Sequence, residues 1–125
     1  MILSPNDSNC KLYLPFSEGS GTTAKDYSSG SNDGTITGAT YTKIQDGSYA
    51  LDCSSDTISW SDTGTIGTKL CWKDTGSGWE LDRSPSFITT TGMTSFTGQV
   101  RFIAIYSDTK TTEWIDKFEE LTYIN

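Results

Sequence analysis

Two carboxylates, Glu80 and Asp82, stand two residues apart in the run Trp79-Glu80-Leu81-Asp82. The run follows a glycine-containing turn and alternates as a strand, so both carboxylates would project from one face of it. Paired carboxylates on one face can hydrolyse a glycosidic bond, one acting as nucleophile and the other as acid. The alternative interpretation is a hairpin strand whose carboxylates point outward into solvent.

Histidine is absent from the sequence. This excludes Ser-His-Asp and Cys-His catalysis, histidine-based zinc sites and a histidine pH switch. The cysteines are odd in number and show no Cys-x-x-Cys spacing, so neither zinc binding nor redox chemistry has support. We interpret them as small buried hydrophobic residues in a reducing compartment; one disulfide with one free thiol is the alternative. They are Cys10, Cys53 and Cys71.

Aromatic residues are plentiful, with four Trp, six Tyr and five Phe. A flat aromatic ring can stack on the C–H face of a sugar while a neighbouring Asp, Asn or Ser orients it. Trp79, beside a Gly-Ser-Gly turn, is the best candidate for an exposed ring. Together with Trp60 and Tyr49 it forms the predicted ligand-binding set. For each ring a place in the core is the alternative, because a small domain needs most of its aromatics there.

Length and composition favour one all-β domain covering residues 1–125. Hydrophobic residues make up 34% and charged residues 20%, and Gly, Ser and Thr are frequent, which is typical of short strands with polar turns. The net charge of −7 disfavours nucleic acid as a partner. No apolar stretch is long enough to insert in a membrane, and the first residues lack the pattern of a signal peptide.

Periodicity and turn residues predict about ten short strands. A turn is expected at 54–56, and apolar residues on both faces of the last long strand predict a central position. Near the C-terminus, Trp114, Phe118 and Leu121 recur at one-turn spacing and predict a short helix over 111–121 that packs on the sheet or docks a partner. Residues 122–124 are expected to form a strand beside the first one. The main strands are predicted at 11–16, 35–41, 46–53, 57–60, 68–73, 79–82, 86–89 and 96–106.

Two segments carry a resemblance to a known family. The first contains Glu18-Gly19-Ser20-Gly21-Thr22-Thr23-Ala24 and then Asn32-Asp33-Gly34-Thr35-Ile36, and the second is the strand 96–106. Together with the residues around them, at about 12–60 and 96–123, they resemble the concanavalin A-like, laminin-G-like jelly-roll domains. The resemblance implies a two-sheet antiparallel jelly-roll sandwich with one short helix near the C-terminus. The middle of the chain lacks several family strands, which implies a shortened member.

The resemblance also implies two kinds of site. Family members often bind calcium at a rim turn, and Asp26, Asn32 and Asp33 match that turn. The closing-strand acids of the family are replaced by Arg101 and Phe102, and a positive charge there would oppose calcium, so the alternative is a set of turn-forming residues.

The glucanases of this fold carry three acids in the pattern Glu-x-Asp-x-x-Glu. Here Pro85 stands at the third position, so the general acid is missing and we expect no enzyme activity.

For function, the resemblance implies binding of a glycan or a surface protein through loops at one rim. Such domains occur in extracellular proteins and in phage structural proteins. We therefore expect a non-catalytic recognition or adhesion module on a virion or an extracellular surface, with a homo-oligomer or a virion assembly partner as further possibilities. The alternative is a capsid or tail decoration protein in which a neighbouring chain completes an open sheet edge. A polysaccharide hydrolase is the third hypothesis.

Overall fold

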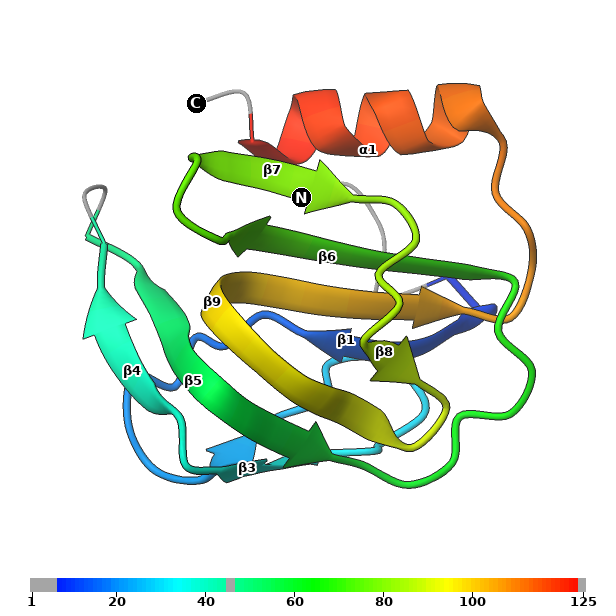
Figure 1. Ribbon diagram of the computed structural model, residues 1–125. Coiled ribbons are helices and arrows are strands. Elements are labelled where there is room, and N and C mark those ends of the chain that lie inside the picture. Colours follow the sequence, from blue (N-terminus) through cyan, green and yellow to red (C-terminus); the bar gives the residue numbers. More distant parts are fainter. Residues whose placement is uncertain (1–6, 45–46, 124–125) are drawn as a thin grey trace.

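The computed structural model describes residues 7–44 and 47–123, which form nine antiparallel strands and one helix (Figure 1). This confirms the predicted mostly antiparallel β architecture with one short helix near the C-terminus. The elements are β1 (Cys10–Leu14), β2 (Thr23–Ala24), β3 (Gly34–Thr37), β4 (Thr40–Lys43), β5 (Tyr49–Ser59), β6 (Thr68–Asp74), β7 (Trp79–Asp82), β8 (Ile88–Thr89), β9 (Gly92–Tyr106) and α1 (Thr112–Tyr123).

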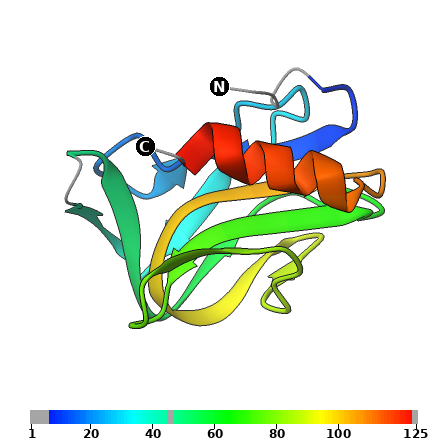
Figure 2. The same cartoon turned by 90° about the horizontal axis from the view of Figure 1, so that it is seen from above.

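Strand β9 joins the two halves of the sheet. Its first part pairs with β5 and β8, and its second part pairs with β1 and β6. The main path of the sheet runs β2-β3-β5-β9-β6-β7. Because β9 is 15 residues long and bends along its length, the sheet coils around it (Figures 1 and 2). The nine strands form one hydrogen-bonded sheet, and the predicted division into two jelly-roll sheets stays a prediction.

The two faces of the sheet build two hydrophobic clusters. Alternation in β1 sends Leu12 and Leu14 to one face and Tyr13 to the other. The inner cluster lies within the coil of the sheet and includes Leu51, Ile58 and other residues of β1, β5, β6 and β9. The outer cluster lies between the second half of β9, its neighbours and α1.

Helix α1 covers the outer face of the sheet (Figure 2). It begins where the Thr111 hydroxyl accepts a hydrogen bond from the Trp114 amide at 3.1 Å, a typical N-terminal cap. Phe118 is 2% exposed; its ring stacks on Trp114 at 5.4 Å and meets Phe102 edge-on at 5.5 Å. The predicted packing of Trp114 and Phe118 is therefore confirmed, whereas the side chain of Leu121 lies outside the described set.

Three details of the predicted secondary structure were wrong. The expected turn at 54–56 is a bulge within the continuous strand β5, where Ser55 takes a φ of 59°. The strand expected at 122–124 does not form at its first two residues, because α1 continues through Tyr123; residue 124 lies outside the described range. The strand expected at 35–41 is divided into β3 and β4 by a break at residues 38–39, whereas the nine strands of the described part agree with the predicted number of about ten.

Candidate functional site

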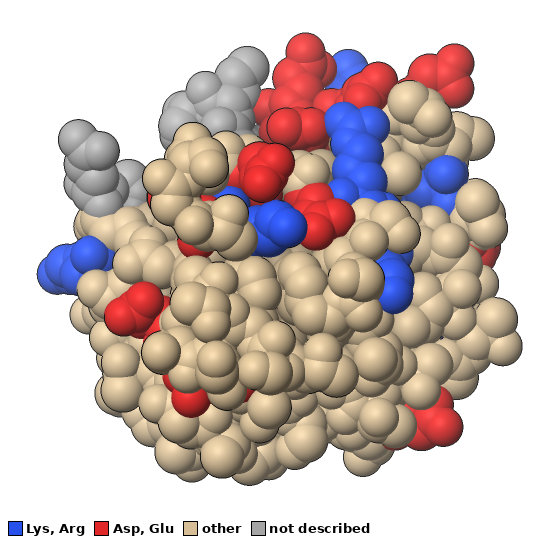
Figure 3. Space-filling view, viewed as in Figure 1, with Lys and Arg blue, Asp and Glu red and all other residues tan. Residues whose placement is uncertain are grey.

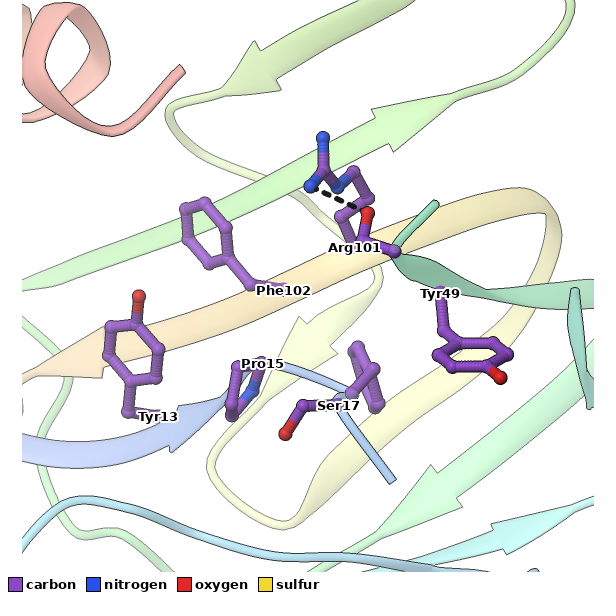
Figure 4. A pocket seen from close by; sticks show the side chains of 8 residues that line it. Tyr13, Pro15, Ser17, Tyr49, Arg101 and Phe102 are labelled. Atoms are coloured by element: carbon purple, nitrogen blue, oxygen red, sulfur yellow. Dashed lines mark hydrogen bonds between the residues drawn. The ribbon is translucent and has the colours of Figure 1, made fainter. Parts of the chain in front are cut away.

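A cleft of about 340 Å³ opens where β1 ends, β5 begins and β9 bends (Figure 4). Two of its rings, Tyr13 and Phe102, belong to the outer cluster, so the cleft lies on the outer side of the sheet. The described residues that line it are Tyr13, Pro15, Phe16, Ser17, Ser48, Tyr49, Arg101 and Phe102. The rings of Tyr13, Tyr49 and Phe102, the hydroxyls of Ser17 and Ser48, and the Arg101 guanidinium therefore meet in one place.

A β-bulge places Arg101 and Phe102 side by side on the wall of this cleft. Across the β6–β9 ladder, Phe102 stands opposite Trp72 and Val100 stands opposite Lys73, so Arg101 is an extra residue in β9. Val100 faces the inner cluster and Phe102 faces the outer one. In a regular strand these two residues would share a face. The bulge breaks that alternation, and both Arg101 and Phe102 line the cleft as a result.

The chain reverses at the end of β1 through an unusual backbone conformation. Pro15 follows the last residue of the strand, as expected for a residue that cannot donate to the ladder. Phe16 then adopts a φ of 53°, in the left-handed region that bulky residues rarely occupy. Its side chain is fully buried in the inner cluster, which holds this conformation in place. The turn brings Pro15 and Ser17 to the cleft (Figure 4).

Tyr49, at the start of β5, is held on three sides. A Cβ atom built on Gly19 would approach the Tyr49 ring to 2.9 Å, so only glycine lets the ring lie against this backbone. The Tyr41 ring meets it edge-on at 6.4 Å, and Lys43 Nζ lies 5.9 Å from its centroid. The ring is half-buried and borders the cleft. Tyr49 is thus the one predicted ligand-binding residue that the structure places in the cleft.

The polar groups of the cleft are oriented by their neighbours. Arg101 Nη2 donates a hydrogen bond to Ser48 Oγ at 2.9 Å (Figure 4). Tyr13 stacks on Phe102 with ring centroids 5.9 Å apart, and burial raises the pKa of Tyr13 to about 12. The phenol is therefore neutral at physiological pH. Arg101 is the only charged side chain among the described residues of the cleft.

The residues predicted to bind calcium lie together, and Asp26 is the centre of a hydrogen-bonded network. The Asp26 carboxylate is 3% exposed. Its Oδ1 accepts hydrogen bonds from the Tyr13 and Ser28 amides, both at 2.9 Å, and its Oδ2 accepts one from the Asn32 amide at 2.7 Å. Asp33 Oδ1 accepts from the Asp26 amide at 2.9 Å. This network also closes the free edge of β1, since the Tyr27 amide donates to the Tyr13 carbonyl.

A cation at this turn would have to compete with three amide hydrogens for one carboxylate. Within residues 7–44 and 47–123, no three Asp, Glu, Cys or His side chains form a group that could hold a metal ion. Calcium binding by Asp26, Asn32 and Asp33 stays a prediction.

The other predicted ligand residues lie apart from the cleft. Trp60 is 6% exposed and belongs to the inner cluster, so its ring faces are covered. Trp79 is half-buried at the first position of β7, opposite Asp74. On the same strand Glu80 is exposed, and Asp82 forms an ion pair with Lys73 at 2.8 Å. None of these residues borders the cleft.

Sequence reasoning missed most of the cleft. Arg101 was considered only as a charge opposing calcium, Ser48 was placed within the predicted strand 46–53, and Ser17 was not singled out. The signal that could have found Arg101 is its position as a lone cation inside the apolar run Val100-Arg101-Phe102-Ile103. Such an interruption in a central strand indicates either a bulge or an outward-facing site.

Comparisons with protein families, with curated proteins and with solved structures gave no match for this chain. The resemblance to the concanavalin A-like domains therefore stays a prediction. Among the described residues, no helix has the length and apolar character needed to cross a membrane.

Proposed function

We propose that this protein is a non-catalytic recognition module that binds a glycan in the cleft beside Tyr49. The observation that carries the proposal is the combination of a half-buried tyrosine ring with the hydroxyls of Ser17 and Ser48 in one cleft of about 340 Å³. Sugar rings offer an apolar C–H face and peripheral hydroxyls, which match a ring and nearby polar groups. The volume lies at the lower end of small-molecule sites, about 300–1,000 Å³.

The composition of the cleft supports binding rather than catalysis. Its described lining contains no Asp, Glu, Cys or His, so none of these groups stands there to activate Ser17 or Ser48 as a nucleophile. A glycosidase needs two carboxylates facing the scissile bond. Glu80 and Asp82 both lie on β7 outside the cleft, and Asp82 is engaged by Lys73. We therefore keep the expectation that the protein is not an enzyme.

The proposal includes the finer fold assignment and the setting. The coiled sheet would be a shortened concanavalin A-like jelly roll whose two layers stay joined through β9, which is supported by its passage through both halves of the sheet. The module would act on a virion or an extracellular surface, as the family resemblance implies. The proposal does not include calcium at the Asp26 turn, and glycan binding at the Tyr49 cleft should be the same with calcium and with a chelator.

A glycan array followed by titration calorimetry tests the proposal. We expect retention of at least one glycan class, and a loss of roughly tenfold or more in affinity for Tyr49→Ala, since a central aromatic contact is commonly worth more than 1 kcal/mol. The matched control is Tyr27→Ala, which removes an aromatic ring that is 47% exposed and lies outside the cleft. Equal affinity of the Tyr49 variant and the native protein would reject this site, and failure to retain any glycan would reject the function.

A structural role in an assembly is the second candidate, and one observation favours it. Strand β7 ends the sheet, and no strand among the described residues pairs with its outer edge. An open edge can accept a strand from a neighbouring chain. Light scattering on the purified protein separates the two candidates. A stable oligomer without glycan affinity would favour the structural role, whereas a monomer that binds glycan would favour recognition.

A further inference from the structure

We infer that the sugar bound in the cleft is neutral, carries two adjacent free hydroxyls, and donates hydrogen bonds from both of them to the Glu18 carboxylate. The ligand class is a terminal hexose whose neighbouring hydroxyls are unsubstituted. This inference rests on the proposed function, because it names the chemistry of the ligand at the same site. It goes beyond that function by assigning the recognition of the sugar to one acidic side chain beside Tyr49.

Glu18 stands at the mouth of the cleft. Ser17 and Tyr49 both line the cleft (Figure 4), and Glu18 follows Ser17 directly in the chain. The next residue, Gly19, has a φ of 76°, and its backbone lies against the Tyr49 ring. Glycine suits this position both for its φ and for the close approach, so the backbone beside Glu18 is fixed. The Glu18 side chain is exposed and therefore accessible to a ligand.

Two donors within the protein hold the Glu18 carboxylate in one orientation. Its Oε1 accepts a hydrogen bond from the Tyr41 hydroxyl at 3.0 Å, and its Oε2 accepts one from the Lys25 amide at 2.9 Å. Burial and the hydrogen bond to Glu18 raise the pKa of Tyr41, so its hydroxyl keeps the proton that it donates. A carboxylate offers about four lone-pair positions, so each oxygen can accept a further hydrogen bond from a ligand.

The neighbouring aromatic rings bring this carboxylate to the ligand. The Tyr41 ring meets the Tyr49 ring edge-on at 6.4 Å, so the carboxylate that Tyr41 holds lies beside the ring proposed to contact the sugar. Adjacent hydroxyls on a sugar ring can reach the two oxygens of one carboxylate, and such charge-assisted hydrogen bonds are stronger than neutral ones. Because the acceptor is already oriented, less side-chain freedom is lost on binding. Glu18 is therefore a binding residue, and Tyr41 is a positioning residue that acts through it.

The charge of the protein favours a neutral sugar over an acidic one. The net charge is −7, and acidic side chains gather over α1 (Figure 3). An acidic sugar in the cleft would place a second carboxylate near Glu18, and like charges repel. Arg101 also lines the cleft, where it donates a hydrogen bond to Ser48 Oγ at 2.9 Å. Uronic acid forms are therefore included in the test, since tight binding of them would mean that Arg101 outweighs Glu18.

The first test uses the native protein and changes only the sugar. The probes are the methyl glycosides of glucose, galactose and mannose, their mono-O-methyl derivatives and their uronic acid forms, measured by ligand-observed NMR. O-methylation removes the donor from one hydroxyl, so it should weaken binding roughly tenfold at each of two adjacent positions of the glycoside that binds best, and less elsewhere. The uronic acid form of that glycoside should also bind roughly tenfold more weakly.

The second test changes the protein. Glu18→Gln keeps the size of the side chain but replaces one acceptor oxygen by an amide group. It should weaken binding roughly tenfold and remove the extra methylation penalty at the two adjacent positions. Tyr41→Phe removes only the hydroxyl that holds Glu18 and should weaken binding about threefold. Glu80→Gln is the matched control, because it neutralises an exposed carboxylate of β7 outside the cleft and should leave affinity and methylation penalties unchanged.

Each outcome decides a separate question. If neutral glycosides bind and Tyr49→Ala weakens them, but Glu18→Gln with native circular dichroism leaves the methylation penalties unchanged, the proposed function stands and the inference about Glu18 is overturned. The inference alone is also overturned if a uronic acid form binds as tightly as its neutral form, or if a glycan array retains a ligand but no methyl glycoside binds. If no glycan is retained at all, both the function and the inference are overturned.

Discussion

Replacing Asp26 by asparagine should destabilise the protein more than any other conservative change at an acidic residue. The carboxylate is 3% exposed and accepts three backbone hydrogen bonds, from the amides of Tyr13, Ser28 and Asn32. The Asp26→Asn side chain keeps one acceptor oxygen and presents an amide group to at least one of these donors. One donor then loses its acceptor, and the remaining bonds lose their charge.

The size of the effect follows from these bonds. A hydrogen bond to a charged group contributes about 1.5–3 kcal/mol, so losing one and weakening the others should lower the free energy of unfolding by about 3 kcal/mol. A domain of this length has a total stability of roughly 6–19 kcal/mol, which makes the loss readily measurable. Urea unfolding followed by tryptophan fluorescence gives the difference directly, and the melting temperature should fall by about 10 °C.

The control is Asp62→Asn, the same substitution in an exposed loop. Asp62 Oδ1 accepts one hydrogen bond, from the Gly64 amide at 2.9 Å, and this bond is exposed to solvent. We expect a change below about 0.5 kcal/mol there. If Asp26→Asn unfolds within that same margin of the native protein, the network does not hold the edge of β1 and the reasoning is refuted.

Three further predictions concern the core and the turns. The three buried thiols should resist modification by a thiol reagent at neutral pH until the protein is unfolded. Rapid labelling of the folded protein would contradict this expectation. Burial raises the pKa of Cys10 and of Cys53 to about 12, above the ordinary value of 9.0. The free energy of unfolding should therefore be intact below about pH 9 and fall between about pH 9 and pH 12. Phe118→Ala should cost about 3–5 kcal/mol and loosen α1, visible as faster amide exchange in the helix, whereas unchanged exchange would show that the helix docks by other contacts. Gly38→Ala should lower the free energy of unfolding in urea by about 1–3 kcal/mol, because its φ is 93° and the added carbon would collide with the Asp56 carboxylate; an unchanged free energy would mean that this turn relaxes.

Calcium can be tested with the same thermal assay. Since both oxygens of Asp26 already accept amide hydrogens, we expect calcium and a chelator to give the same melting temperature. A rise in melting temperature that saturates with calcium would instead support the predicted site at Asp26, Asn32 and Asp33.

The regular parts of the fold could be predicted from the sequence because their side chains follow strand or helix periods. The strand predicted at 79–82 coincides with β7, and Thr68 begins β6 as expected. Apolar residues on both faces of 96–106 correctly indicated a central strand, and Trp114 with Phe118 indicated the helix. In each case local pattern and tertiary packing agree.

The bulges could not be predicted in the same way. At residues 54–56 the polar run Ser-Ser-Asp reads as a turn, yet β5 continues because both neighbouring segments pair with β9. At Arg101 the neighbouring apolar residues Val100 and Phe102 belong to opposite faces of the sheet. Because apolar residues occur on both faces of this strand, the sequence pattern does not indicate that the strand contains an extra residue. The cleft depends on this second bulge and on segments more than 80 residues apart in the sequence, from Tyr13 to Arg101. Its assembly is set by tertiary structure, and only Tyr49 was identified beforehand.

The most direct test of the central claim is a backbone amide NMR titration of the protein with the oligosaccharide that binds most tightly. We expect saturable shift changes concentrated at Ser17, Ser48, Tyr49, Arg101 and Phe102, with little change at Trp79 and Glu80 on β7. Shift changes centred on β7 or on the Asp26 turn, or no saturable changes at all, would contradict the assignment of the cleft as the ligand-binding site.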